Sequence, residues 1–140
     1  MTRQRFKVGI VGLQPGRSWA ARAHIPALRA LSNSYEIVGV ANTSLASAQK
    51  AAAEIGLPRA FANVAELIAA PEVDIVAVTV KVPHHLEIVK AAFEAGKHVY
   101  CEWPLGNGWP RPRNSPRSLG PRGAWAWFER KRASPRKLSI

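Results

Sequence analysis

The sequence predicts an α/β fold built on a doubly wound parallel sheet with helices on both faces. Three observations carry this prediction. Short apolar runs rich in Val and Ile recur through residues 1–102, as in strands that are buried on both faces. Helical segments separate these runs, and that alternation favours right-handed crossovers between parallel strands. A glycine-bearing turn follows the first run and precedes the first helix, which is the arrangement of a phosphate-binding turn.

The first strand is expected from Phe6 and ends at Gly12, and Pro15-Gly16 then forms a loop. An Ala-rich helix begins near Ser18 or Trp19. Glycine lets the backbone approach a pyrophosphate, and the start of the helix offers unpaired N–H groups. An ordinary strand-to-helix turn is the alternative, because the full dinucleotide fingerprint needs more glycines and an acidic partner.

The first helix is expected to extend to Leu31, with a kink at Pro26, because proline removes one hydrogen bond of the helix and crowds the preceding turn. Tyr35 to Ala41 reads as the second strand. Thr43 or Ser44 can cap the next helix, which runs to about Ile55 and stops at Gly56.

The second half of the sheet follows the same alternation. Ala60–Ala62 is a candidate very short strand, and a helix is expected from Asn63, its cap, to Ala69. Val73–Val80 is the third long buried strand, Pro83–Ala95 a helix that starts at a proline and ends before Gly96, and His98–Glu102 the next strand. Ligands of such sheets bind at the carboxyl ends of the strands. Those ends carry residues 12–17, 42–44, 80–83 and 102–104.

Charge and cysteine content narrow the class of protein. Residues 1–108 hold 11 Lys and Arg against 8 Asp and Glu, whereas residues 109–140 hold 9 against 1, so the net charge of +11 belongs mostly to the C-terminal stretch. No apolar run is long enough for a membrane span or a secretory signal. Cys101 is the only cysteine, which excludes an internal disulfide and favours the cytoplasm. The four histidines lack metal-ligand spacing, so no metal site is expected.

The stretch 109–140 does not continue the α/β pattern. It contains five Pro and nine Lys or Arg without a usable period, which is typical of a disordered or irregular basic tail. A shifted reading frame with permitted G+C-rich codons gives an amphipathic helix and then a strand at this place. We therefore expect residues 1–108 to form an incomplete dinucleotide-binding domain and residues 109–140 to be a non-native, frameshifted tail rather than an evolved one.

Four segments together resemble the N-terminal Rossmann half of Gfo/Idh/MocA-type NAD(P)-dependent oxidoreductases. They are V-G-I-V-G in the first strand, A-H-I-P-A-L (Ala23–Leu28), H-H-L-E-I-V-K-A-A-F-E-A-G-K-H-V (His84–Val99) and C-E-W-P-L (Cys101–Leu105). The resemblance covers about residues 5–108. It implies that NAD or NADP binds in this domain. In intact relatives it also implies hydride transfer with a sugar, polyol or related small molecule held by a second domain.

Three residues or groups depart from that family's pattern. Gln14 stands where a second glycine is usual, as in the subgroup related to the fungal galactose-pathway corepressor, which binds a dinucleotide without being a working enzyme. Asn42-Thr43-Ser44 replaces the acidic residue that grips the ribose 2′-hydroxyl, so NADP is at least as plausible as NAD. Trp103 replaces the usual Lys, which removes a polar contributor near the nicotinamide.

The resemblance and the strand ends together give the expected cofactor contacts. The turn would hold the pyrophosphate, the end of the second strand would meet the adenine ribose, and the third and fourth strand ends would lie beside the nicotinamide. The residues, in that order, are Gly12, Leu13, Gln14, Pro15, Gly16 and Arg17; Asn42, Thr43 and Ser44; and Val80, Val82, His85, Glu102 and Trp103. For Arg17, His85 and Glu102, a solvated or purely structural role is the open alternative. Neither a catalytic residue nor a metal ligand is expected.

The leading hypothesis is an NAD(P)-binding domain of such an oxidoreductase, truncated and inactive alone. The substrate pocket and most of the oligomer interface would lie in the missing part. The alternative is a non-catalytic dinucleotide-sensing module that binds another protein. Nucleic-acid binding through the tail is a weaker third reading, because a basic tail adheres to polyanions without specificity. We expect no specific nucleic acid and no membrane among the partners.

Overall fold

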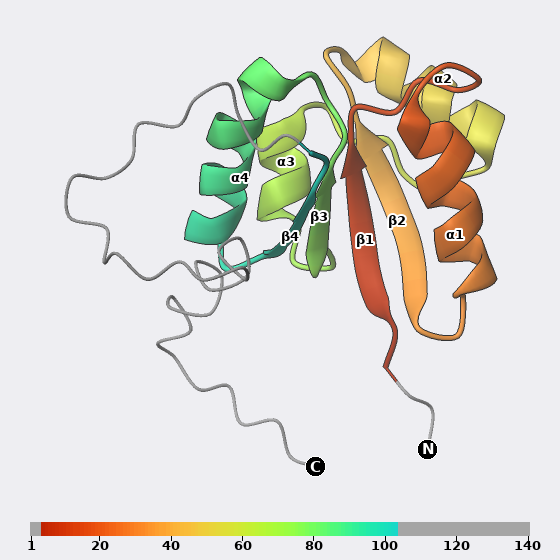
Figure 1. The fold of residues 1–140 in the computed structure, drawn as a ribbon, viewed down its shortest axis with the longest axis horizontal. Coiled ribbons are helices and arrows are strands. Elements are labelled where there is room, and N and C mark those ends of the chain that lie inside the picture. The colour runs from red at the N-terminus through yellow and green to blue at the C-terminus, as the bar shows by residue number, and fades with distance from the viewer. Residues whose placement is uncertain (1–3, 104–140) are drawn as a thin grey trace. The chain divides into compact units, whose positions relative to one another are not determined.

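The computed structural model describes residues 4–103, which form a four-stranded parallel sheet (Figure 1). The strand order is β2-β1-β3-β4, and every neighbouring pair is parallel. The strands are β1 (Phe6–Val11), β2 (Tyr35–Ala41), β3 (Ile75–Val78) and β4 (His98–Cys101). The helices are a π-helix (Ala20–His24), α1 (Ile25–Ala30), α2 (Leu45–Ile55), α3 (Val64–Ala69), a 3-10 turn (Val82–His84) and α4 (His85–Glu94).

Helices cover both faces of the sheet, as the sequence predicts for a doubly wound fold. Figure 1 shows α1 and α2 on one face and α3 and α4 on the other. Side chains alternate between the faces along each strand, so β1 sends Val8 and Ile10 into one apolar cluster and Val11 into the other. The first cluster includes Ala48 of α2, and the second includes Val89 of α4. The sheet therefore contributes side chains to two apolar cores, one on each of its faces.

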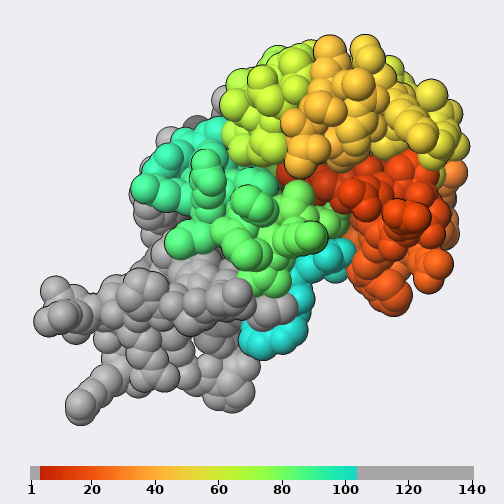
Figure 2. Space-filling model, turned by 90° about the horizontal axis from the view of Figure 1, so that it is seen from above, coloured from red at the N-terminus to blue at the C-terminus, as the bar shows by residue number. Residues whose placement is uncertain are grey.

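The chain reverses direction across the sheet at β1. From β1 the chain moves outward to β2, then returns past β1 to β3 and continues to β4. The loops after β1 and β3 therefore leave in opposite directions, and ligands of such sheets bind at the carboxyl ends where the strand order reverses. Figure 2 looks down on this edge and shows the red turn after β1 between the segment leading into α2 and the green segment after β3.

Three expected elements differ from the observed ones. The helix expected over Pro83–Ala95 starts as a 3-10 turn at Val82–His84, and α4 begins at His85. The helix that was expected to kink at Pro26 instead contains a π-turn just before it, and the Ile25 N–H donates to the Ala20 carbonyl five residues back. The wider turn has the same cause as the expected kink, because Pro26 has no N–H to donate and its ring crowds a carbonyl of the preceding turn. The third strand, expected over Val73–Val80, is shorter at both ends, since Val73 lies in a turn bonded to Ala70.

Other boundaries agree closely with the sequence. Ser44 and Asn63 cap α2 and α3 through their side chains, and Gly56 ends α2 in the left-handed conformation. The candidate short strand at Ala60–Ala62 is a single parallel bridge between Ala60 and Val40. In the part that the structure describes, no helix is long and apolar enough to cross a membrane. The expectations for residues 104–140, the basic tail included, lie outside the described residues.

Candidate functional site

The turn after β1 begins at Gly12, where no other residue fits. Gly12 has a φ of +93°, and a Cβ there would lie 2.5 Å from the Val80 side chain and 3.1 Å from the Thr79 carbonyl. Thr79 fixes this contact, because its hydroxyl donates to the carbonyls of Val11 and Gly12 at 2.9 and 3.1 Å. The backbones of β1 and β3 therefore meet closely at the carboxyl edge, and a glycine at position 12 permits this approach.

The amide groups of the turn are largely used inside the turn. The Leu13 N–H donates to the Asn42 side chain at 2.9 Å, and the Gln14 N–H donates to the Ser18 hydroxyl at 3.1 Å. Pro15 has no N–H, and the Arg17 N–H donates to the Gln14 carbonyl. Within residues 4–103, Gly16 is thus the turn residue whose N–H has no acceptor.

The end of β2 is clamped to the turn by Asn42. Its amide accepts from the Leu13 N–H and donates to the Leu13 carbonyl, both at 2.9 Å, and also donates to the carbonyl and hydroxyl of Ser47. Ser44 accepts from the Ser47 N–H as the cap of α2, and Thr43 is exposed between them. Of the three expected ribose contacts, Asn42 and Ser44 therefore have internal partners, whereas the Thr43 side chain faces solvent.

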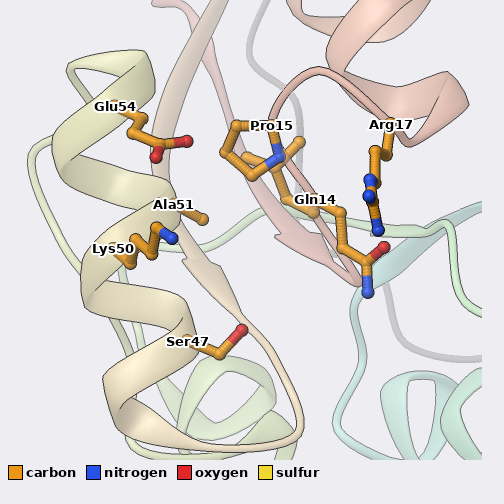
Figure 3. Close-up of a pocket in the computed structure, with 8 residues that line it drawn as sticks. Gln14, Pro15, Arg17, Ser47, Lys50, Ala51 and Glu54 are labelled. Carbon is orange, nitrogen blue, oxygen red and sulfur yellow. The ribbon is translucent and has the colours of Figure 1, made fainter.

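A hollow of about 350 Å³ separates the turn from α2 (Figure 3). From α2, Ser47, Lys50 and Glu54 line it, and Figure 3 shows the Lys50 ammonium group pointing toward the turn. From the turn, Gln14, Pro15 and Arg17 line it, with Arg17 on the far side of Gln14. In the described part of the chain neither Lys50 nor Arg17 forms an ion pair. Two positive side chains thus flank the hollow.

Sequence reasoning missed Ser47 and Lys50. Their spacing of three places them on one face of a helix whose cap is Ser44, one of the two candidates that the sequence offers. That spacing was the available signal, but the direction of this face toward the turn depends on tertiary packing.

The end of β3 contributes Val80, Val82 and His85. The valines are partly buried, and the His85 side chain is buried, with 1% of its surface exposed. Its Nε2 lies 2.6 Å from the Val80 carbonyl oxygen. The ring is buried beside Val80, and a direct contact of His85 with the cofactor stays a prediction.

The end of β4 presents Glu102 and Trp103. The Glu102 N–H extends the ladder to the Val78 carbonyl, and its carboxylate lies 2.7 Å from Nε2 of His24. Trp103 is 86% exposed. Cys101 points to the other face, where burial, helped by the Glu102 carboxylate, raises the pKa of its thiol to about 11. The thiol therefore stays protonated near neutral pH.

These groups fit a dinucleotide. The close packing of β3 on Gly12 fixes the turn at the carboxyl edge, where the Gly16 N–H, Arg17 and Lys50 are donors or cations suited to phosphate. Farther along the edge, the Val80 and Val82 side chains suit a planar ring, and the Glu102 carboxylate suits a ribose. Among the described residues, no three His, Cys, Asp or Glu side chains gather in a way that could hold a metal ion.

Comparison with known proteins agrees with this fit. Residues 6–109 match the family described as the GFO_IDH_MocA oxidoreductase family, NAD-binding Rossmann fold. The chain is 41% identical over 109 residues to Dehydrogenase aclE of Aspergillus oryzae, covering 74% of this chain and 30% of that protein. It is 34% identical over 108 residues to the galactose/lactose metabolism regulatory protein GAL80 of Kluyveromyces lactis, covering 71% and 24%.

A solved structure shares the fold. The biliverdin reductase of Synechocystis, crystallised with biliverdin and NADP+, matches with a TM-score of 0.61 and 33% identity, covering 71% of this chain and 30% of that one. The chain thus spans less than a third of the length of these relatives. Turn, strand order and similarity lead to one conclusion: the chain belongs to the Gfo/Idh/MocA oxidoreductase family and carries its NAD-binding Rossmann domain.

Proposed function

We propose that the domain holds NAD or NADP with the diphosphate over the turn from Gly12 to Arg17. The observation that carries this proposal is the turn itself: the tight contact of Gly12 with β3 fixes it at the carboxyl edge, and the Gly16 N–H, beside open space, has no acceptor among the described residues. Because most N–H groups of the turn have internal acceptors, the diphosphate would depend on the Gly16 N–H and on the Arg17 guanidinium. Arginine binds phosphate oxygens with charge-assisted, often bidentate hydrogen bonds.

In this arrangement the adenosine half would extend from the turn toward the end of β2. Thr43 and Ser44 would lie beside the ribose, and the hollow between the turn and α2 would receive its 2′ substituent. No acidic residue follows β2 directly, so a 2′-phosphate is not repelled there. Lys50 and Ser47 offer a cation and a hydroxyl to such a phosphate, while Glu54 lies one turn farther along the helix. We therefore propose that NADP binds at least as well as NAD.

The nicotinamide half would lie across the ends of β3 and β4. Val80 and Val82 would form an apolar wall for the ring, with His85 fixing the Val80 carbonyl. Glu102 would accept a hydrogen bond from the ribose or the carboxamide, and Trp103 would offer a stacking face. Bound this way, the cofactor would present its reactive ring near the β4 end of the edge.

We propose that the activity served by this domain is hydride transfer between the nicotinamide and a sugar, polyol or related small molecule. The cofactor supplies the hydride chemistry, and the protein must hold it against the substrate. The carboxyl edge that the structure describes offers groups for ribose, phosphate and ring. A substrate would need further groups, so we propose that residues 1–140 alone bind the cofactor without turnover.

Calorimetric titration of the full chain with NADH and with NADPH tests this proposal. We expect saturable binding of at least one cofactor, and Arg17→Ala should weaken it by on the order of tenfold, the loss of about 1.5 kcal/mol that corresponds to one exposed charged hydrogen bond. Lys90→Ala is the control, because it also removes an exposed positive charge, on α4 and away from the turn, where Lys90 pairs with Glu94. No binding of either cofactor by a folded sample would refute the proposal.

A second candidate function is a non-catalytic dinucleotide sensor. The specific observation is Trp103, a large and 86% exposed side chain where a lysine is usual, at the edge expected to face the ring. A full-length homologue with the same Glu-Trp-Pro segment separates the two readings. The sensor reading predicts cofactor binding with no sugar- or polyol-dependent reduction of NAD(P), whereas the oxidoreductase reading predicts measurable reduction.

A further inference from the structure

Two polar side chains far apart in the sequence meet beside the end of β4. His24 and Glu102 are 78 residues apart, yet Nε2 of His24 lies 2.7 Å from Oε1 of Glu102. Their side chains keep 16% and 23% of their surface exposed. A hydrogen bond to a carboxylate is stronger when it is partly shielded from water, so this contact can hold the carboxylate in one orientation.

The π-turn brings His24 to this position. His24 is the last residue of the π-helix Ala20–His24, and Pro26 follows two residues later in α1. A π-turn contains one residue more than an α-turn, so it changes the direction in which the next side chains point. Such turns occur frequently at functional sites, which makes the placement of this histidine a feature to explain.

β4 brings a second side chain to the same imidazole. Side chains two apart on a strand point to the same face, so Tyr100 and Glu102 both face His24. The Tyr100 and His24 rings meet edge to face, with centroids 5.2 Å apart and planes at 77°. The imidazole is therefore held from two directions, by a ring and by a carboxylate. Figure 2 shows the end of β4, in cyan, beside the orange helical segment.

The location of the pair gives it a role in binding. Glu102 lies at the carboxyl edge on the β4 side, opposite the hollow beside α2, with the turn between them. A dinucleotide whose diphosphate lies over the turn and whose adenosine half extends toward α2 must extend its other half toward β4. A carboxylate accepts hydrogen bonds from ribose hydroxyls or from an amide NH2.

We propose that His24 is a positioning residue that pre-orients the Glu102 carboxylate to accept a hydrogen bond from the nicotinamide–ribose half of the dinucleotide. This inference rests on the proposed function. With Oε1 held by His24, Oε2 keeps a fixed direction, and less side-chain freedom is lost when the ligand binds. Removing the imidazole leaves the carboxylate in place but free to rotate.

The test compares two ligands that share one half. NADH contains the nicotinamide–ribose, and ADP contains the adenosine and diphosphate without it. On the full chain, we expect His24→Ala to weaken NADH by about five- to tenfold, the loss of part of a charged hydrogen bond, while ADP affinity stays within about twofold. His24→Gln, which keeps an N–H donor, should restore most of the NADH affinity. His98→Ala, at the other end of β4, is the control and should change neither.

A double-mutant cycle makes the dependence on Glu102 explicit. If His24 acts through Glu102, the variant with both His24→Ala and Glu102→Ala should bind NADH no more weakly than Glu102→Ala alone. Equal weakening of NADH and ADP by His24→Ala would show a merely structural role and overturn the inference, as would unchanged NADH affinity or additive losses. A wild-type chain that binds neither ligand would instead overturn the proposed function, and this inference with it.

Discussion

Gly12 and Gly16 share a left-handed backbone but differ in their surroundings. Their φ angles are +93° and +71°, and a Cβ would contact Val80 at Gly12 but nothing within 4 Å at Gly16. Gly16→Ala should therefore cost only the backbone term of about 1–2 kcal/mol. Gly12→Ala should cost about 1–3 kcal/mol more, because the methyl group must displace Val80 or the β3 backbone.

Urea denaturation of the two variants measures this difference as a shift of the midpoint. The paired design cancels the conformational term that both substitutions share. Equal losses of stability would contradict the close approach at Gly12, and with it the shape of the candidate phosphate cradle.

Cys101 links pH to stability. Burial and the Glu102 carboxylate raise its thiol pKa from the ordinary 9.0 to about 11. Between these values the unfolded chain ionises the thiol while the folded chain keeps its proton, so stability should fall as pH rises through this window. Urea titrations of wild type and Cys101→Ala at pH 8 and pH 10.5 measure this effect. The free energy of unfolding of the wild type should exceed that of the variant by less at pH 10.5 than at pH 8. A difference that grows with pH would contradict the raised pKa.

For single residues, the sequence predicts local features such as helix caps, but it does not predict contacts between residues far apart in the chain. Ser44 and Asn63 were identified as caps from their position before an apolar helical pattern. The hydrogen bonds between the Asn42 amide and Leu13, 29 residues away, could not be predicted from the sequence. The contact between His24 and Glu102 was equally invisible, because spacing along the chain says nothing of which helix turn faces which strand end.

At the scale of elements, α3 depends on its first turn. Asn63 accepts from the Glu66 N–H at 2.8 Å, and the Glu66 carboxylate accepts from the Ala62 N–H. That hydrogen bond and Arg59 lower the pKa of Glu66, so its contribution is present at neutral pH and is lost as pH falls through the lowered pKa. Asn63→Ala should destabilise the domain by about 1 kcal/mol.

Chemical denaturation of Asn63→Ala and Asn63→Asp checks this expectation. The aspartate keeps the capping oxygen and should retain most of the stability, whereas alanine removes it. If both variants lost the same stability, the side-chain cap would not be what stabilises the start of α3.

The boundaries of the first helix and of β3 could not be predicted from the local sequence alone. Pro26 correctly indicated an irregular first helix, but the irregularity is a π-turn placed before the proline, where the carbonyl that the ring would crowd can be displaced. The apolar run Val73–Val80 predicts a longer strand than the observed β3. Val73 and Val80 pack against the apolar core but lie outside the hydrogen-bonded strand. A run of apolar residues indicates which residues are buried, and the buried or partly buried residues here extend beyond the ends of β3.

At the scale of the whole molecule, the fold was predictable because its pattern is redundant. Four apolar runs, the helices between them and the glycine turn all favour the same doubly wound sheet, and the two apolar clusters confirm it. The hollow beside α2 was not predictable, since it depends on how two separate segments pack. Chain topology nevertheless placed all four strand ends at one edge, which is the basis of the proposed cofactor orientation.

An NMR titration of the amide-labelled full chain with NADPH shows, residue by residue, where the dinucleotide binds. If the dinucleotide binds along the carboxyl edge, the largest shifts should occur at Gly12, Gly16 and Thr43. Gly56 and Gly96, which end α2 and α4 at the opposite edge, serve as internal controls and should move least. Larger shifts at Gly56 and Gly96 than at the turn, or no shifts at all, would contradict the account.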